Sequence, residues 1–319
     1  MGLNNLLKDV LFIEPEHGFY YPFIKSDGLN IVSPYKGGKL LFLRILRELH
    51  FRLNLPCKYI WYNSKTINKY STFFVFEELL IPEFLKWLYQ KDPDRLIVLF
   101  YANLCKPFNH ANMFDDKWCI KWSGDSGDCT MYRMNMCTGS TSFFKSWHIV
   151  KQNPNIDVFY IGRDKGRLDY LLGLEKNLRD LGLNPYFHIA SGVKYTIKRD
   201  HHYKPLIPYT KVLEYLSHSR AILHLEQGAQ ACITIRLQES LVNRIKLITD
   251  SKDIKKYKFY DPDNIFILGE DDISTLPRFL DKPYKEVNLE ELGDFYFENL
   301  ATRIIGQSIE IKRNRECNR

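Results

Sequence analysis

The 319-residue chain is predicted to form two α/β domains, each a parallel sheet covered by helices. Residues 205–250 give the clearest signal, because they follow the order helix, strand, loop, helix, strand that such sheets require. Residues 95–103 form a continuous apolar run, which is typical of a strand buried on both faces. The length is sufficient for two domains or one large domain, each with a substantial core.

The first half of the chain alternates strand-like and helical segments. Apolar runs predict strands at 8–14, 58–62, 71–79 and 95–103. Helices are predicted at 39–53 and 81–91, the second with Pro82 in its first turn, where proline is favoured. The aromatic and Gly-rich segment 15–38 is predicted to be a long loop. This half is interpreted as a Rossmann-like domain spanning residues 1–152.

The second half repeats the pattern, and residues 153–285 are interpreted as a second Rossmann-like domain. Apolar runs predict strands at 156–162, 221–226, 245–249 and 264–268. Apolar spacing predicts helices at 167–182, 209–220 and 236–244. A final helix is predicted at 290–305, and residues 286–319 are assigned to this helix and a basic tail.

A polar loop in residues 226–234 leads from a predicted strand into a predicted helix. In parallel sheets ligands bind beyond the carboxyl ends of the strands, and a helix N-terminus favours a phosphate. A hydroxyl group, a guanidinium and a carboxylate follow at Thr234, Arg236 and Glu239. The first two suit phosphate oxygens and the third suits the hydroxyls of a ribose. The segment therefore predicts a nucleoside diphosphate site, although the same residues also fit a helix cap with a solvated face.

The segment Gln227-Gly228-x-Gln230, followed by Thr234-x-Arg236-x-x-Glu239-Ser240-Leu241, resembles the donor loop of bacterial GT-B glycosyltransferases of capsule and lipopolysaccharide synthesis. Residues 157–183 and 246–268 are also similar to that family. The likeness covers about half the chain, mostly residues 156–270. The first 150 residues match loosely, and Gly124 stands where relatives often have Phe in a W-S-F-D motif.

The resemblance implies two Rossmann-like domains facing each other across a cleft, with the C-terminal helix crossing back to the first domain. It implies a nucleotide-sugar donor and a lipid-linked or glycan acceptor. The implied donor-binding residues are Arg163, Lys165, Gln227, Gly228, Gln230, Thr234, Arg236 and Glu239. Two alternatives stay open: a related transferase of glycerophosphate or pyruvate, and a non-catalytic glycan- or nucleotide-binding protein.

Cationic groups are expected to stabilise the departing diphosphate, with Arg236 central and Arg163 or Lys165 assisting. If the reaction inverts the anomeric centre, a base in the first domain must deprotonate the acceptor hydroxyl. The candidates are Glu14, Glu16, His17, Glu77 and Asp125. Glu16 and His17 rank first because they follow the first predicted strand.

No metal or other cofactor is expected. The two Asp-x-Asp triplets, Asp92-Pro93-Asp94 and Asp261-Pro262-Asp263, both contain proline and precede their strands. They are therefore interpreted as turns at the edge of the sheet opposite the ligand. The adjacent His201 and His202 lack further ligands nearby and are interpreted as a solvated turn.

Composition indicates a globular protein, with 45% hydrophobic and 14% aromatic residues. The net charge of +7 is modest, and the chain lacks the dense basic stripe expected of nucleic-acid binding. Seven cysteines without a CxxC pair, and no signal or transmembrane run, predict a cytoplasmic protein. The basic segments 252–258 and 312–319 are compatible with peripheral contact with the inner membrane leaflet.

Overall fold

The computed structural model describes residues 6–37, 40–78, 80–107, 109–137, 143–191, 201–226, 234–288 and 296–317. The chain divides into two compact units. Unit 1 comprises residues 1–146 and 294–319, and unit 2 comprises residues 147–293. The predicted domain boundaries, after residues 152 and 285, lie a few residues from these divisions.

Unit 1 contains a six-stranded parallel sheet in the order β2-β1-β3-β4-β5-β6. The strands are β1 (Val10–Ile13), β2 (Ile31–Val32), β3 (Thr72–Phe76), β4 (Leu96–Tyr101), β5 (Ile120–Ser123) and β6 (Asn135–Met136). The chain runs from β1 to β2 on one side and then crosses to β3 on the other side of β1. The strand order therefore reverses between β1 and β3, which is where parallel sheets bind ligands.

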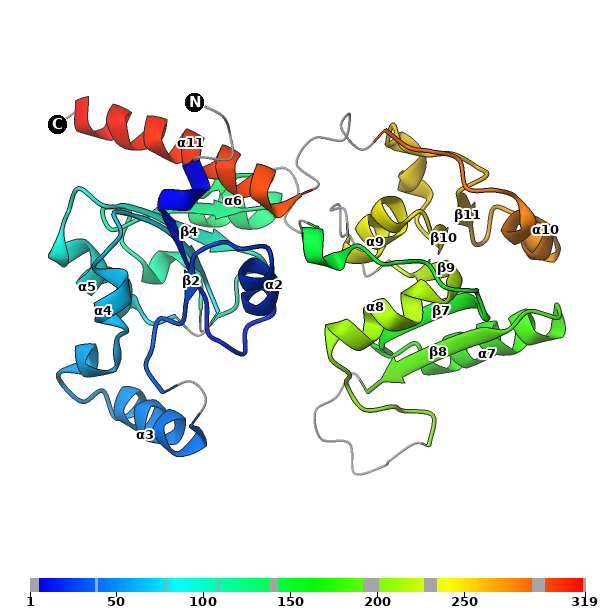
Figure 1. Ribbon diagram of the computed structural model, residues 1–319, viewed down its shortest axis with the longest axis horizontal. Coiled ribbons are helices and arrows are strands. Elements are labelled where there is room, and N and C mark those ends of the chain that lie inside the picture. The colour runs from blue at the N-terminus through cyan, green and yellow to red at the C-terminus, as the bar shows by residue number, and fades with distance from the viewer. Residues whose placement is uncertain are drawn as a thin grey trace. The chain divides into compact units, whose positions relative to one another are not determined.

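Most helices of unit 1 lie around this sheet, whereas α3 (Leu41–Arg52) lies apart from it (Figure 1). The other helices are η1 (Leu7–Asp9), α2 (Tyr21–Ser26), η2 (Lys58–Trp61), α4 (Ser64–Ile67), α5 (Pro82–Lys91), η3 (Ala111–Met113), α6 (Ser126–Tyr132), η4 (Lys145–Trp147) and α11 (Phe297–Cys317). On one face of the sheet, Phe84, Leu85 and Leu88 of α5 pack against alternate residues of the central strands. The other face is covered by α11, which contacts β4 and β5.

The C-terminal helix belongs to unit 1, as predicted. Phe297, at its start, is buried and lies 4.9 Å from Phe144 and 5.4 Å from Phe12 between ring centroids. Further along the helix, the Ser308 hydroxyl accepts a hydrogen bond of 2.9 Å from the Trp122 indole. The helix extends to Cys317, so most of the predicted basic tail is helical.

Replacing Phe297 by alanine is expected to destabilise the protein by about 3–5 kcal/mol, because it leaves a cavity among packed aromatic rings. Chemical denaturation with a probe in unit 1 measures the effect. Phe42→Ala is the matched control, since Phe42 is 69% exposed and its loss should change the free energy of unfolding by about 0.5 kcal/mol or less. Equal effects of the two substitutions would contradict this account of the helix packing.

Unit 2 contains a five-stranded parallel sheet in the order β11-β10-β9-β7-β8. The strands are β7 (Ile156–Arg163), β8 (Pro185–Ala190), β9 (Ser219–His224), β10 (Lys246–Thr249) and β11 (Ile265–Ile267). The chain moves from β7 outward to β8 and then crosses to β9 on the other side of β7. Unit 2 thus repeats the reversal seen in unit 1, here between β7 and β9.

Helices cover both faces of the second sheet. They are α7 (Leu168–Asp180), α8 (Tyr209–Ser217), α9 (Ile235–Asn243), η5 (Lys252–Lys256), η6 (Ile273–Thr275) and α10 (Leu276–Asp281). Val158 and Tyr160 pack in one cluster with residues of α7 and α10. Phe159, between them, points to the other face and stacks on Tyr215 of α8. The two parallel-sheet units confirm the predicted fold class.

Two local predictions in the first half were wrong. Residues 58–62, predicted as a strand, begin with the 3-10 helix η2, in which Tyr59 and Ile60 are exposed. A short apolar run can form a buried strand only if neighbouring elements cover all of it, and here they cover Tyr62 but not Tyr59 and Ile60. The predicted loop 15–38 also contains α2 and β2.

No helix among the described residues is long and apolar enough to span a membrane.

Candidate active site

A tight basic turn follows β7 at the strand-order reversal of unit 2. Its buried residue Asp164 accepts hydrogen bonds from the Gly166 amide, at 3.1 Å, and from the Tyr203 hydroxyl, at 3.3 Å. Lys165 and Gly166 both have positive φ, at 49° and 79°. This conformation ends β7 and starts α7 within a few residues. Arg163, Lys165 and Arg167 are thereby concentrated at the carboxyl end of the strand.

Arg167 links this turn to the end of the neighbouring strand β9. Its Nη1 donates a hydrogen bond of 2.7 Å to the carbonyl oxygen of Glu226. The Glu226 amide in turn donates to the Asp250 carboxylate at 2.8 Å, and the Ser251 hydroxyl donates to the Glu226 side chain. The carboxyl ends of β7, β9 and β10 are therefore joined by polar contacts that fix the base of the site.

The N-terminus of α9 contributes the second part of the basic cluster. Thr234 is its N-cap and accepts a hydrogen bond of 3.5 Å from the Leu237 amide. At the second residue of the helix, Arg236 forms an ion pair with Glu239, whose side chain is fully buried. The Tyr209 hydroxyl donates to the other oxygen of the Glu239 carboxylate. Glu239 thus holds Arg236 in place, and a ribose would have to compete for the same carboxylate oxygens.

The pKa shifts of His224 and Lys165 indicate that these cations share one electrostatic environment. Burial lowers the pKa of His224, at the end of β9, to about 4; nearby Asp250 opposes this shift, and Arg236 and Arg167 add to it. Burial also lowers the pKa of Lys165, with Arg167 and Arg163 contributing in the same direction. The cations converge on one edge of the sheet, where an anionic ligand would relieve their mutual repulsion.

The structure therefore gathers Arg163, Lys165, Thr234, Arg236 and Glu239 at one edge of the second sheet. The predicted ligands Gln227, Gly228 and Gln230 lie outside the described residues. Two contributors were missed from the sequence, Arg167 and Tyr209. Arg167 had a usable signal, because it lies in a basic loop at a helix start. Tyr209 had none, since its role depends on the approach of α8 to α9.

An acidic pair occupies the corresponding edge of unit 1. Glu14 follows β1 and Glu77 follows β3, so both lie where the strand order reverses. Glu77 accepts hydrogen bonds from the Asn103 side chain, at 3.2 Å, and the Ala102 amide, at 3.3 Å. Burial raises the pKa of the Glu77 carboxyl.

Glu14 is the more strongly perturbed carboxyl. It is 1% exposed, and burial, with smaller repulsions from Glu78 and Glu77, raises its pKa to about 8. The Tyr20 amide donates to its Oε1 at 3.2 Å. Its Oε2 is buried and has no hydrogen-bond partner among the described residues. A buried polar atom without a partner is costly unless water or a ligand satisfies it, so this oxygen marks Glu14 as a candidate for a functional role.

The loop from Pro15 to Phe19 encloses the Glu14 carboxyl closely. A Cβ atom at Gly18 would lie 2.5 Å from Glu14 Cδ, which no real contact permits. A side chain at position 18 would therefore displace the Glu14 carboxyl from its present position.

The other predicted base candidates are less enclosed. Glu16 is half-buried and His17 is exposed. Partial shielding from water and the cations Arg44 and Arg47 lower the pKa of His17, and Glu78 and Glu48 oppose this shift. Asp125 caps α6 and accepts a hydrogen bond of 2.8 Å from the Asp128 amide. Burial, the raised pKa and the unpaired oxygen distinguish Glu14 from these groups.

The raised pKa of Glu14 predicts a pH-dependent stability. Its folded-state value of about 8 exceeds its ordinary value of 4.5, so its contribution to stability is complete below pH 4.5. That contribution is lost as the pH rises toward 8, by up to about 1.4 kcal/mol per pH unit. Glu14→Gln should therefore lose less stability over this range than the unsubstituted protein, as measured by urea unfolding. Glu77 contributes a similar trend in both proteins.

Glu16→Gln is the control for this experiment, because Glu16 lies in the same loop but is only half-buried. It should leave the pH dependence of unfolding nearly unchanged. Parallel pH profiles for the original protein and Glu14→Gln would contradict the burial of an ionisable Glu14.

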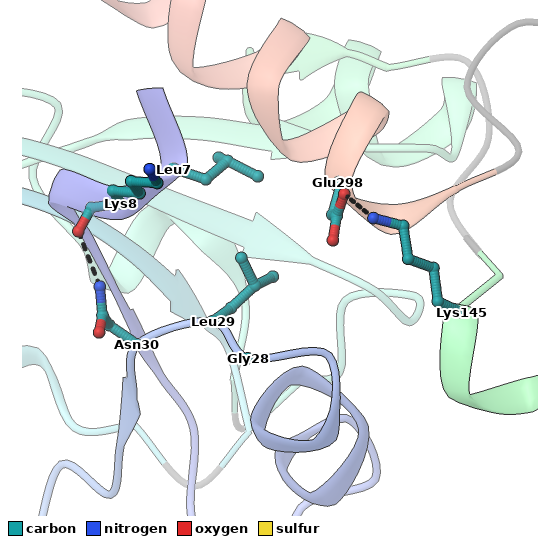
Figure 2. Close-up of a pocket in the computed structure, with 7 residues that line it drawn as sticks. All are labelled: Leu7, Lys8, Gly28, Leu29, Asn30, Lys145 and Glu298. Atoms are coloured by element: carbon teal, nitrogen blue, oxygen red, sulfur yellow. Dashed lines mark hydrogen bonds and ion pairs between the residues drawn. The ribbon is translucent and has the colours of Figure 1, made fainter. Parts of the chain in front are cut away.

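A separate pocket of about 470 Å³ lies at the opposite edge of the first sheet, beside the starts of β1 and β2 (Figure 2). Its residues are Leu7, Lys8, Gly28, Leu29, Asn30, Lys145 and Glu298. Lys145 and Glu298 form an ion pair of 2.6 Å, and Asn30 donates to the Lys8 carbonyl at 2.8 Å. Lys145 and Glu298 already pair with each other, and the pocket lies at the amino edge of the strands, so it is a weaker candidate.

Both Asp-x-Asp triplets form turns at the amino ends of strands. Asp92 accepts a hydrogen bond of 3.0 Å from the Asp94 amide just before β4, and Asp261 accepts one of 2.8 Å from the Asp263 amide before β11. Asp263 also pairs with Lys282 and Lys285. Within the described ranges, no three His, Cys, Asp or Glu side chains cluster in a way that would hold a metal ion.

Comparison with known proteins gives distant structural likenesses only. No family model and no curated protein sequence matches the chain. A DNA-modifying β-glucosyltransferase, solved with and without uridine diphosphoglucose, is 12% identical over 94% of both chains, with a TM-score of 0.45. The spinosyn forosaminyltransferase SpnP is 14% identical over 94% of this chain and 95% of its own, with a TM-score of 0.35. A 3-phosphoglycerate dehydrogenase of Entamoeba histolytica is 11% identical over 96% of both chains, with a TM-score of 0.21.

Proposed function

We propose that the protein is a glycosyltransferase that uses a nucleotide-sugar donor. The observation that carries the proposal is the basic cluster of Arg163, Lys165, Arg167 and Arg236 at the strand-order reversal of unit 2. Two helix N-termini, those of α7 and α9, add partial positive charge at the same edge. This combination suits a diphosphate with a nucleoside on one side and a sugar on the other.

In this proposal the basic cluster binds the donor and stabilises the leaving diphosphate. Negative charge accumulates on the diphosphate as the bond to the sugar breaks, so fixed cations lower the barrier. Arg236 supplies one such cation, held by Glu239 and Tyr209, and Lys165 and Arg163 supply others. We propose that these cations act without a metal ion, because both Asp-x-Asp turns lie at the amino edges of their sheets.

Glu14 is proposed as the base that activates the acceptor hydroxyl. A carboxylate with a pKa of about 8 accepts a proton far more readily than an ordinary one, and its Oε2 is unpaired. Proton transfer from the acceptor to Oε2 would accompany attack of the acceptor oxygen on the sugar. Glu16 and His17, ranked first on the sequence, are proposed to shape the loop around Glu14.

The acceptor and the cellular location are proposed from the sequence resemblance. The acceptor is proposed to be a lipid-linked or other glycan of capsular polysaccharide or lipopolysaccharide synthesis. The protein is proposed to act in the cytoplasm, peripheral to the inner face of the membrane. A transfer of this kind requires a nucleotide site and a base, and the proposal assigns the first to unit 2 and the second to unit 1.

Nucleotide binding tests the donor site. Thermal unfolding with UDP, GDP, CMP or dTDP should show a higher midpoint with one diphosphate, because a ligand of the native state adds about 2.7 kcal/mol of stability at a hundredfold excess over its Kd. Lys165→Gly should reduce the shift, since Lys165 is exposed and glycine tolerates its positive φ. This variant is preferable to Arg236→Ala, which would leave the buried Glu239 carboxylate without its cation.

Lys176→Ala is the matched control, because it removes an exposed lysine from α7 away from the site. It should keep the full nucleotide shift. No shift with any nucleotide, or an equal loss in both variants, would contradict the donor site and favour a glycan-binding protein.

Transfer assays test the base. Glu14→Gln should lower the transfer rate by about 10²–10⁴-fold while retaining nucleotide binding. The unsubstituted enzyme should become faster as the pH rises to about 8 and then level off, because the carboxyl must lose its proton to act as a base. If Glu16→Gln abolished transfer and Glu14→Gln did not, the base would be the one ranked first on the sequence.

A further inference from the structure

Helix α3 of unit 1 carries an apolar face that points away from the protein. Its large apolar residues Leu41, Phe42, Ile45, Leu46 and Leu49, with Leu53 just beyond its end, are 38–69% exposed. At about 100° per residue they occupy an arc of roughly 140° on one side of the helix. Amphipathic helices of globular proteins normally bury such an arc, so this helix has the reverse orientation.

The opposite side of α3 fixes this orientation. Arg47 is buried, with its guanidinium 4.7 Å from the centroid of the Tyr35 ring, and it pairs with Glu48. Phe51 packs edge-on against the same tyrosine ring, at 5.3 Å. The helix is therefore anchored through a cation and an aromatic ring, and the apolar arc remains exposed.

The exposed surface continues beyond the helix. Tyr59 and Ile60 of η2 are also exposed, and η2 contacts α3. In Figure 1, α3 lies apart from the sheet of unit 1, at the lower left of that unit. We define the α3 face as the six apolar residues of the arc together with Tyr59 and Ile60.

The charge around the α3 face indicates what covers it. Residues 40–60 contain four basic side chains, of which Arg47 pairs with Glu48 and Lys58 pairs with Glu83. The other two, Arg44 and Arg52, leave a local excess of positive charge beside the face. A helix with a wide apolar face flanked by arginine is suited to an anionic bilayer surface, where apolar groups enter the headgroup boundary and cations meet lipid phosphates. An apolar surface of a neighbouring protein would not require the excess of positive charge.

We propose that the α3 face docks the protein on an anionic phospholipid bilayer. The helix lies in the plane of the interface, with Phe42 and its apolar neighbours in the headgroup boundary. This proposal does not depend on the proposed transfer reaction.

Vesicle flotation of the full chain tests the proposal. The protein should float with vesicles of phosphatidylglycerol and phosphatidylcholine in equal amounts, and much less with phosphatidylcholine alone. Raised salt should weaken the binding. The double variant Phe42→Gln/Ile45→Gln should bind at least about tenfold more weakly, because it removes two large apolar groups while keeping good helix formers. Arg44→Gln/Arg52→Gln should weaken binding mainly at low salt.

The control is Val150→Gln/Leu206→Gln, which removes two apolar side chains elsewhere in the chain that are even more exposed than Phe42 and Ile45. It should bind vesicles as the original protein does. Absence of binding to anionic vesicles, or equal binding by the Phe42→Gln/Ile45→Gln variant, would overturn the proposal. A dimer that this variant dissociates, seen by sedimentation without vesicle binding, would overturn it in favour of a second copy of the chain.

Nucleotide-induced thermal shifts measured on the same variants separate this proposal from the proposed function. The Phe42→Gln/Ile45→Gln variant should retain the shift, because neither residue belongs to the basic cluster. Loss of vesicle binding with an intact nucleotide shift would support the α3 face as a membrane surface. Vesicle binding without any nucleotide shift would leave the docking proposal standing and count against the transferase.

Discussion

The reversal of strand order in a parallel sheet determines where each unit can hold a ligand. At such a point the loops on either side diverge, and the groups at the carboxyl ends of two neighbouring strands are left beside each other. The chain makes this reversal twice, between β1 and β3 and between β7 and β9. The charged groups of the proposed reaction, the cations around the diphosphate and the carboxyl that acts as base, all lie at the carboxyl ends of these four strands or in the segments that follow them.

The two edges have opposite character. In unit 2 the edge carries arginine and lysine, and burial with neighbouring cations lowers the pKa of His224 to about 4. In unit 1 the edge carries Glu14 and Glu77, whose pKa values are raised by burial. A cationic site suits the departing diphosphate, and a carboxyl with a high proton affinity suits the acceptor hydroxyl. A glycosyl transfer needs both a cationic site and a base. The basic edge of unit 2 and the acidic edge of unit 1 together therefore support the proposed function better than either edge alone.

Sequence patterns predicted most of the framework, because buried parallel strands are apolar throughout and their helices have regular apolar spacing. They also located Arg236 and Glu239 at a helix start. The prediction failed at 58–62, where Tyr59 and Ile60 are exposed and Lys58–Trp61 form a 3-10 helix instead of a strand. The raised pKa of Glu14 could not be predicted from the sequence, because the burial of this side chain depends on how the loop folds over it and on the close approach of Gly18 to its carboxyl. The Tyr209 contact with Glu239 likewise joins residues 30 positions apart.

Hydrogen exchange of the backbone amides, with and without a nucleoside diphosphate, tests the central claim most directly. The account predicts slower exchange on nucleotide addition at residues 164–168 and 235–236, where α7 and α9 begin. It predicts no change around Leu7, Asn30 and Glu298, which line the pocket at the amino edge of unit 1. Protection at that pocket, or no protection anywhere with saturating nucleotide, would contradict the assignment of the basic edge of unit 2 as the donor site.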